Sequence, residues 1–399
     1  MTTPILKHKR RSALLFIAAL FITLSGIAQD DSSIAIAHRT ELFSKILNEK
    51  RTVYVSTPGS MKKGETFPVI YLLDGEAFIE MAGGQVRYLS ESYKITPSMI
   101  VVGIRNTDRT RDLTPTHYNL GPDGRPDTSA SAFGRTSGGG ENFLRFIKEE
   151  LMPFVEARYP AGPYKILAGH SLGGLMAVYC MVNHPGYFNA YIAMSPSLQW
   201  DNEVMLKQAA EKLGNGTLAK RFFFCDANEG GAFHANQLKL DSLLRQKNAN
   251  GLNYKYVYYP EETHTSEPVK ALYDGLRHVY PEWHLTYNSA FRKVVNSQII
   301  KEHYKKLSAI YGYEVTPLQE EIIQVSRFLR NDPKRIADAI DLLQTYIPRY
   351  PNALNMQELL GDIYVKAGER EKAKAVYQNL LKRSPDNAAL QQKLKQLVP

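Results

Sequence analysis

The sequence has few of the residues on which metal centres and disulfide-stabilised folds depend. Its 399 residues include only two cysteines, Cys180 and Cys225, and no CxxC or HExxH stretch. The spacings typical of zinc sites are missing, and we expect neither a metal nor a cofactor. An exported chain could pair its two cysteines. Both lie in apolar runs, however, which favours buried side chains that behave as small hydrophobes.

The chain also lacks a concentrated run of like charge. Its formal net charge is +9, and four of the positive charges lie before residue 12, so the remainder carries +5. This charge is spread along the sequence. It could help to attract an anionic substrate, but a solvated surface is the simpler interpretation. No nucleic-acid partner is expected, because the dense basic patch typical of such proteins is absent from the sequence.

A long apolar run occurs only at the N-terminus. The basic stretch LKHKRR (6–11) precedes the apolar stretch SALLFIAALFITLSG (12–26), and small residues follow at Gly26 and Ala28. This pattern predicts a signal peptide over residues 1–28, cleaved after Ala28. An uncleaved N-terminal anchor is the alternative, whereas a lipoprotein anchor is excluded because no cysteine lies near the cleavage site. We therefore expect a periplasmic or secreted protein.

Short β-rich runs alternate with helical patterns between residues 50 and 262. Most of the strand candidates are continuously apolar, as expected for strands buried on both faces, at 51–58, 67–74, 98–104, 164–170, 189–196, 221–227 and 254–260. Apolar residues at helical spacing occur at 140–159, 172–184, 235–248 and 267–280. Strands that alternate with helices predict an α/β fold with a mainly parallel sheet flanked by helices.

A long loop is predicted between two of these elements. Residues 105–139 are rich in Gly, Pro, Thr, Asp and Arg. Loops of this length inside a compact domain are usually functional insertions or mobile lids. Because the stretch follows a strand, we expect it to border the site.

After Trp283 the sequence becomes wholly helical. Residues 354–387 fit one tetratricopeptide repeat, with pattern positions at Leu360, Gly361, Tyr364, Ala373, Tyr377 and Pro385. The 34 residues upstream form a degenerate repeat. We therefore divide the chain into a signal peptide (1–28), an α/β domain (29–285), a helical linker (286–320) and a small all-α domain of tetratricopeptide-like repeats (321–399). So short an array is expected to pack on the α/β domain or on a protein partner.

The stretch GHSLGG (169–174) lies between an apolar strand and an apolar helix. Strand, GxSxG and helix in this order are typical of the turn that exposes a nucleophilic serine, here Ser171. Gly169 and Gly173 leave room for the backbone to pass closely. A helix N-terminus favours a developing anion, and the N–H of Leu172 can serve as one oxyanion donor.

A nucleophilic serine needs a base and an acid, which follow it in the order acid, then histidine. His264 is the best base, because it lies on a polar loop after the last strand; His234 is a weaker alternative. Glu229 and Asp226 both lie just past a strand upstream of His264, and we favour Glu229 as the acid.

The second oxyanion donor is expected from the loop after an early strand, where the N–H of Glu76 follows Asp74-Gly75. The pocket candidates are Trp200, Arg105 and Arg109. For the arginines, which share their loop with Arg111, solvated charges in local salt bridges are at least as good an interpretation.

Five stretches together resemble the esterase family of α/β hydrolases that includes esterase D, feruloyl esterases and enterochelin-type siderophore esterases. They are VIYLLDGEAF (69–78), IVVGIRNTDRTRDLTP (100–115), GGGENFLRFIKEELMPFVEARYP (138–160), ILAGHSLGGLMAVY (166–179) and AYIAMSPSLQWD (190–201). The resemblance covers about residues 38–285. The helical repeats look like those attached to some exported bacterial members.

This resemblance implies Ser171 as the nucleophile, His264 as the base and an acid that looks most like Glu229. It also implies oxyanion N–H groups from Glu76 and Leu172. Relatives often have two tryptophans after SPSL, where this chain has Gln199-Trp200, which leaves the substrate open.

The expected function is that of an exported serine esterase acting through an acyl-enzyme. Siderophore trilactones and feruloyl or acetyl esters of plant polysaccharides are the candidate substrates. Two alternatives remain: an acyltransferase that uses the same site, and a repeat-based scaffold with a vestigial hydrolase domain.

Overall fold

The computed structural model describes residues 34–397 except 62–63, 121–123, 130–131, 215–216, 249–250, 284 and 286–287. The predicted signal peptide, 1–28, lies outside the described residues. Among the helices that are described, none is both long enough and apolar enough to cross a membrane.

An eight-stranded sheet forms the centre of the described fold, in the order β1-β2-β4-β3-β5-β6-β7-β8. Its strands are β1 (His38–Ser44), β2 (Glu49–Ser56), β3 (Phe67–Leu72), β4 (Ile100–Ile104), β5 (Ala161–His170), β6 (Ala190–Met194), β7 (Arg221–Ala227) and β8 (Asn253–Tyr259). The pairs β1–β2 and β2–β4 are antiparallel, and every other pair is parallel. The predicted class, a mainly parallel sheet flanked by helices, is confirmed.

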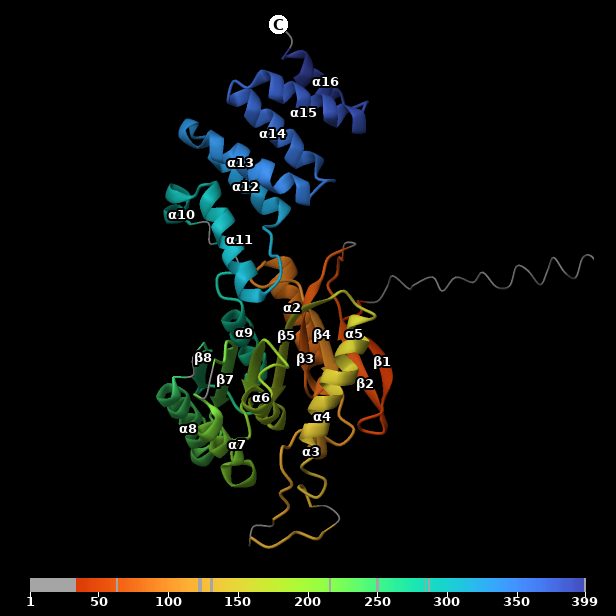
Figure 1. The fold of residues 1–399 in the computed structure, drawn as a ribbon, viewed down its shortest axis with the longest axis vertical. Helices are drawn as coiled ribbons and strands as arrows, with labels where there is room; N and C mark the ends of the chain where they lie inside the picture. Colours follow the sequence, from red (N-terminus) through yellow and green to blue (C-terminus); the bar gives the residue numbers. More distant parts are fainter. Residues whose placement is uncertain are drawn as a thin grey trace, which may run out of the picture.

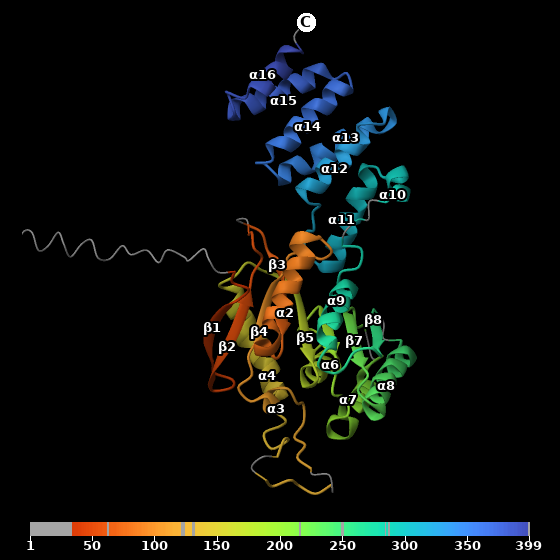
Figure 2. The same ribbon diagram turned by 180° about the vertical axis from the view of Figure 1, so that it is seen from behind.

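Helices cover both faces of the sheet. The face turned to the viewer in Figure 1 carries α4 (Gly140–Phe146), η2 (Ile147–Leu151), α5 (Met152–Glu156), α6 (Leu172–Asn183), α7 (Trp200–Lys212) and α8 (Gly231–Lys247). The opposite face, seen in Figure 2, carries α2 (Gly75–Arg87), followed by η1 (Tyr88–Ser92), and α9 (Glu267–Val279). The short helix α3 (Arg109–Asp112) lies in the long loop after β4.

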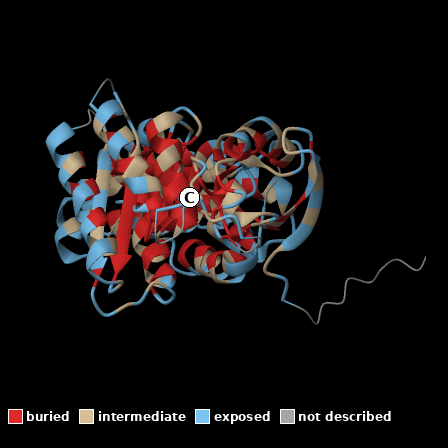
Figure 3. Cartoon of the chain, turned by 90° about the horizontal axis from the view of Figure 1, so that it is seen from below, coloured by how far each residue is buried: buried red, intermediate tan, exposed pale blue. Residues whose placement is uncertain are grey.

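The two faces of the sheet build two separate apolar cores, because side chains alternate along a strand. On β3, Ile70 and Leu72 pack in the core beneath α2 and α9, whereas Val69 and Tyr71 pack in the core beneath α4–α8. Both sets are fully buried, which explains why the strands read as continuous apolar runs. Figure 3 shows the buried residues gathered along the strands and the exposed residues on the outer helices.

The C-terminal region is helical throughout its described residues. Its elements are α10 (Ser289–Val294), α11 (Ser297–Tyr311), α12 (Gln319–Leu329), η3 (Pro333–Arg335), α13 (Ile336–Tyr346), η4 (Ile347–Arg349), α14 (Leu354–Lys366), α15 (Arg370–Arg383) and α16 (Ala388–Lys395). Neighbouring helices pack in pairs, α12 with α13 and α14 with α15. Gly361 allows the second pair to approach closely, because a Cβ at this position would lie 2.4 Å from the ring of Tyr377.

An aromatic cluster joins the C-terminal helices to the sheet domain. The ring of Tyr311, at the end of α11, lies 5.1 Å from that of Tyr164, 5.0 Å from that of Tyr280 and 5.6 Å from that of Trp283. The Tyr311 hydroxyl donates a hydrogen bond of 3.0 Å to the carbonyl of Val279. Tyr164 belongs to the first half of β5, so the helices attach at the amino-terminal edge of the sheet, as Figure 1 shows.

Removing the Tyr311 ring tests this junction. We expect Tyr311→Ala to lower the free energy of unfolding by about 3–5 kcal/mol, because a buried aromatic ring is lost and a cavity remains. Tyr311→Phe should cost about 1 kcal/mol, because only the hydrogen bond to Val279 is lost. Urea unfolding followed by circular dichroism measures both changes. Tyr88→Ala, at an exposed tyrosine, is the control. Equal losses of stability in Tyr311→Ala and Tyr88→Ala would contradict the role of Tyr311 in joining the helices to the sheet domain.

Candidate active site

Ser171 occupies a sharp turn between β5 and α6. Its backbone has φ 59° and ψ −115°, in a region that non-glycine residues rarely adopt. Neighbouring glycines allow this path, because a Cβ on Gly169 would lie 2.5 Å from the carbonyl carbon of Gly173. Two hydrogen bonds fix the turn: the N–H of Ser171 donates to the carbonyl of Met194 at 2.9 Å, and that of Ser197 donates to the carbonyl of Ser171 at 3.0 Å.

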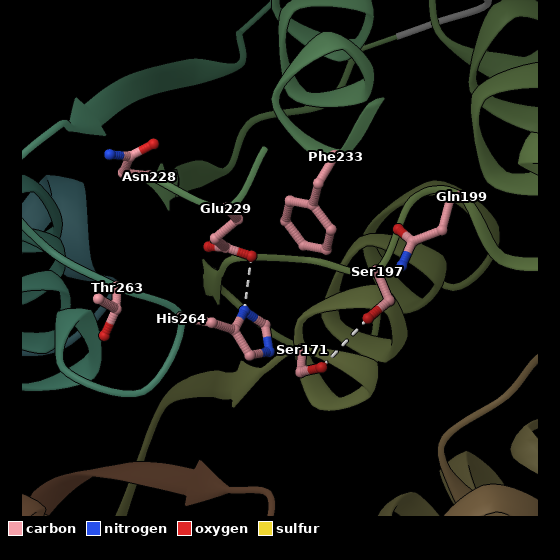
Figure 4. Close-up of a pocket in the computed structure, with 8 residues that line it drawn as sticks. All are labelled: Ser171, Ser197, Gln199, Asn228, Glu229, Phe233, Thr263 and His264. Atoms are coloured by element: carbon pink, nitrogen blue, oxygen red, sulfur yellow. Dashed lines mark hydrogen bonds and ion pairs between the residues drawn. The ribbon is translucent and has the colours of Figure 1, made fainter. Parts of the chain in front are cut away.

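The structure brings Ser171, His264 and Glu229 together at the carboxyl edge of the sheet. His264 Nδ1 donates to Glu229 Oε2 at 2.6 Å, and its other ring nitrogen points toward Ser171 (Figure 4). The Ser171 hydroxyl lies 3.2 Å from that of Ser197. The arrangement can withdraw a proton from the serine and hold the imidazolium that forms.

These groups border a cavity of about 450 Å³. Its lining residues are Ser171, Ser197, Gln199, Asn228, Glu229, Phe233, Thr263 and His264 (Figure 4). Ser195, Ser197 and Asn228 were not predicted from the sequence. Ser195 and Asn228 directly follow β6 and β7, and Ser197 lies two residues beyond Ser195. The rule that polar groups at strand carboxyl ends gather around a site could have found them.

Glu229, rather than Asp226, pairs with His264. Asp226 is buried and turned elsewhere: its Oδ2 accepts from His234 Nδ1 at 2.6 Å, and its Oδ1 accepts from the Tyr256 hydroxyl at 2.7 Å. Burial raises the pKa of Asp226 above its ordinary value, although these two hydrogen bonds oppose the shift. His234, the weaker candidate for the base, is thus engaged with a different carboxylate.

Glu229 is held in its charged form by its neighbours. Burial alone would raise the pKa of Glu229, but hydrogen bonds from His264 and Ser195 outweigh it and hold the pKa below its ordinary value. The Ser195 hydroxyl and the N–H of Ala227 both donate to Glu229 Oε1, the latter at 3.2 Å. An ionised Glu229 can therefore stabilise a positive charge on His264.

The two predicted oxyanion donors lie at the starts of two helices that follow the neighbouring strands β3 and β5. Leu172 is the first residue of α6, and Glu76 is the second residue of α2, so neither N–H can bond within its own helix. The two turns are in contact, because a Cβ on Gly173 would lie 3.3 Å from Asp74 Oδ2. Asp74, which precedes α2, has φ 54°. Backbone N–H groups in this position suit a developing oxyanion.

Arg109 fixes both turns instead of lining the cavity. Its Nε donates to Asp74 Oδ1 at 2.7 Å and its terminal nitrogen to Asp74 Oδ2 at 2.9 Å. The same terminal nitrogen reaches the carbonyl of His170 at 3.4 Å. The expectation that Arg109 meets the substrate is thereby replaced by a structural role: one guanidinium ties the β3–α2 turn to the residue before Ser171.

The other two pocket candidates do not line the cavity either. Trp200 is buried, with its ring nitrogen 3.3 Å from the carbonyl of Thr116 in the long loop, and the preceding residue, Gln199, lines the cavity in its place. Arg105 is exposed, and its backbone bonds to Thr52 and Arg51 on β2. Trp200 therefore anchors the loop. The sequence alone could not distinguish this role from a position in the pocket.

The fold and this geometry define the class: a serine hydrolase with the α/β-hydrolase fold. The chain belongs to the family described as "Putative esterase", whose model matches residues 44–249, just over half of the chain. It is therefore a member of a family of carboxylic-ester hydrolases.

Relatives and solved structures agree with this assignment. The chain is 35% identical over 177 residues to the ferri-bacillibactin esterase BesA of Bacillus subtilis, covering 40% of this chain and 59% of the relative. It is 34% identical over 171 residues to the siderophore enterobactin esterase of Emericella nidulans, covering 39% and 54%. It thus spans little more than half the length of these curated relatives. The crystal structure of an IroE-like serine hydrolase from Shewanella oneidensis matches with a TM-score of 0.68 at 30% identity, over 78% of this chain and 99% of that one.

Substituting the two acidic candidates separates their roles. Glu229→Gln should lower kcat by roughly 10³–10⁴-fold, because a neutral amide cannot hold the required tautomer or stabilise the imidazolium. Asp226→Asn should leave kcat within about tenfold, because its carboxylate bonds to His234 and Tyr256. Hydrolysis of a 4-nitrophenyl ester measures both. Comparable losses in the two variants would refute the assignment of Glu229.

Arg109 provides a second test of the geometry. Arg109→Ala should lower kcat by about tenfold, less than the 10²–10³-fold typical of removing an oxyanion donor itself. KM should change little, because the guanidinium binds Asp74 and not the cavity. Steady-state kinetics with the same ester decide the matter, with Arg145→Ala, an exposed arginine on α4, as the control. A rise in KM without a fall in kcat would instead support a substrate-binding Arg109.

Proposed function

We propose that this chain hydrolyses carboxylic esters through an acyl-enzyme on Ser171. His264 withdraws the proton of the Ser171 hydroxyl as its oxygen attacks the ester carbonyl, and Glu229 stabilises the resulting imidazolium. The N–H groups of Leu172 and Glu76 bind the oxyanion. His264 then protonates the leaving alcohol, and a water molecule attacks the acyl-enzyme by the same route. The contact between His264 and Glu229, beside the strained Ser171, is the observation that carries this proposal.

The proposed substrate class is the ester-linked siderophore. Two lines support it: relatives named as esterases of ferri-bacillibactin and enterobactin, and a cavity whose lining is mainly polar around Ser171. A siderophore trilactone contains several ester bonds. Successive catalytic cycles at Ser171 would therefore open its ring and then cleave the linear product. The polysaccharide esters expected from the sequence have no comparable support among these relatives.

Export and the role of the C-terminal helices complete the proposal. The N-terminal pattern supports cleavage after Ala28 and a periplasmic or secreted enzyme; sequencing the N-terminus of the mature protein tests this.

The spacing around Gly361 and Tyr377 supports tetratricopeptide-like repeats in the helical region, which serve as a protein-binding element. Pull-down with residues 286–399 fused to a carrier, compared with the whole chain, tests that role.

Hydrolysis of a tricatecholate trilactone tests the substrate proposal. Purified residues 29–399 should convert both the iron-free and the ferric trilactone to linear products, which liquid chromatography with mass spectrometry resolves. Ser171→Ala should lose more than about 10³-fold in rate, because no nucleophile remains. Ser60→Ala, at an exposed serine between β2 and β3, is the matched control.

Labelling with a fluorophosphonate probe tests the assignment as a serine esterase separately from the proposed siderophore substrate. Labelling of Ser171 without trilactone cleavage would refute the siderophore but leave the serine esterase intact. No labelling of the folded protein would refute the esterase itself. Adding an alcohol and looking for its ester in the products tests acyl transfer.

A further inference from the structure

A second serine lies beside the proposed nucleophile and has no part in the reaction described above. Ser197 is the third residue after β6, its side chain is buried, and it lines the cavity. Its hydroxyl oxygen lies 3.2 Å from that of Ser171, and Figure 4 shows the two side chains facing one another. Within the described residues, this is the hydrogen bond that the Ser171 hydroxyl makes. A group in this position can act directly on the attacking oxygen.

The turn that carries Ser197 is fixed by contacts on three sides. The N–H of Ser197 donates to the carbonyl of Ser171 at 3.0 Å, so the two backbones are joined as well as the two side chains. The carbonyl of Pro196 accepts a hydrogen bond of 2.8 Å from the side-chain amide of Gln237, which is fully buried. Helix α6 packs against the same turn, because a Cβ on Gly174 would lie 2.9 Å from Cα of Pro196. The Ser197 hydroxyl is therefore held in place, as catalysis requires of a group that meets a developing charge.

The chemistry of the attack decides the direction of the hydrogen bond between the two serines. A hydroxyl has one proton to donate and two lone pairs that accept. Ser171 gives its proton to His264 as it attacks, so this proton is not available to Ser197. Within the described residues, the Ser197 hydroxyl makes no hydrogen bond other than the one with Ser171. Ser197 can thus donate to the Ser171 oxygen while His264 takes the proton from it.

The Ser171 oxygen needs such a donor at two stages of the proposed reaction. It becomes more negative as its proton moves to His264, before its bond to the ester carbon is complete. It becomes negative again when the acyl-enzyme breaks down, because it then takes the electron pair of the breaking bond. The N–H groups of Leu172 and Glu76 are proposed to bind the carbonyl oxygen of the substrate instead. Ser197 therefore supplies a contact that these two donors do not.

We propose that Ser197 is a catalytic residue whose hydroxyl donates a hydrogen bond to Oγ of Ser171 and stabilises the negative charge that develops on that oxygen. This inference rests on the proposed function of Ser171, His264 and Glu229. In acylation the Ser171 proton passes to His264, Oγ bonds to the ester carbon, and the carbonyl electron pair moves onto the oxyanion. In deacylation the bond between Oγ and the acyl carbon breaks, and His264 returns the proton to Oγ. Ser197 keeps its own proton throughout, and its burial limits competition from water.

Removing the hydroxyl of Ser197 tests this role. Ser197→Ala should lower kcat for a 4-nitrophenyl ester by roughly 10–100-fold, the range that corresponds to losing a hydrogen bond to a charged group. KM should change little, because the lost contact is with Ser171 and not with the substrate. Ser197→Thr keeps a hydroxyl and should recover most of the lost kcat. Ser60→Ala, at an exposed serine, is the matched control.

The rate of labelling by a fluorophosphonate isolates the attack of Ser171 from the later steps. The probe reacts with the serine oxygen and requires no deacylation, so Ser197→Ala should slow labelling by about the same factor as kcat/KM. Stopped-flow measurement of nitrophenol release separates the two halves of ester hydrolysis, as a burst followed by a steady rate. Both the burst rate and the steady rate should fall in Ser197→Ala, because the charge on Oγ develops in both halves.

Three results would overturn the inference. Labelling and kcat that do not change in Ser197→Ala would show that the hydroxyl has no part in the attack. A rise in KM with an unchanged kcat would assign Ser197 to substrate binding. Equal losses of activity in Ser197→Ala and Ser197→Thr, with a lower Tm in both, would assign the serine to the packing of its turn.

Failure of the proposed function would differ from all three results. A folded wild-type protein that the fluorophosphonate does not label at Ser171 would refute the serine esterase, and the role of Ser197 with it. Labelling of the wild type without hydrolysis of the ester tested would concern only the substrate. The labelling rates of wild type and Ser197→Ala would then still decide for or against Ser197.

Discussion

The close passage of α6 over the end of β5 is the constraint on which the rest of the site depends. Ser171 can hold φ 59° only because its glycine neighbours have no side chains, and because β6 supplies a carbonyl to its N–H. The strain is met by hydrogen bonds from an adjacent parallel strand. The position of this half-buried serine thus depends on the sheet, and any change that separated β5 from β6 would move it.

A tight turn from a strand into a helix occurs twice in this sheet. β3 and β5 are neighbours, and each leads into a helix through a residue with a positive φ, Asp74 at 54° and Ser171 at 59°. In the first turn a Cβ on Gly75 would lie 2.3 Å from the backbone of Gly103, so this turn too requires glycine. Two helices consequently begin beside one another at the carboxyl edge of the sheet. Arg109 bridges the turns and offsets the negative charge of Asp74.

The sequence predicted the elements that local patterns encode. The apolar strands, the turn at Ser171 and the loop that carries His264 all follow from composition and spacing along the chain. The selection of Glu229 over Asp226 was favoured but not decided, because both follow β7 closely and only the partners of Asp226, His234 and Tyr256, separate them.

Long-range pairing explains what the sequence could not predict. The contact of Arg109 with Asp74 joins two loops on different strands, so its role could not be read from either stretch alone. Glu267 gave no signal, because a glutamate at the start of an amphipathic helix usually caps it in solvent. This glutamate is the buried first residue of α9, and its Oε2 accepts a hydrogen bond from the thiol of Cys225 on β7.

The attachment of the helical region through Tyr311 determines where the C-terminal helices lie relative to the cavity at Ser171. The helices leave from the amino-terminal edge of the sheet, as Figure 1 shows. Ser171 directly follows β5 and so lies at the carboxyl edge. A large body held by α12–α16 would sit at the far end of the molecule and leave the mouth of the cavity unobstructed. The proposed protein-binding helices and the proposed ester site would in this way lie at opposite ends of the molecule.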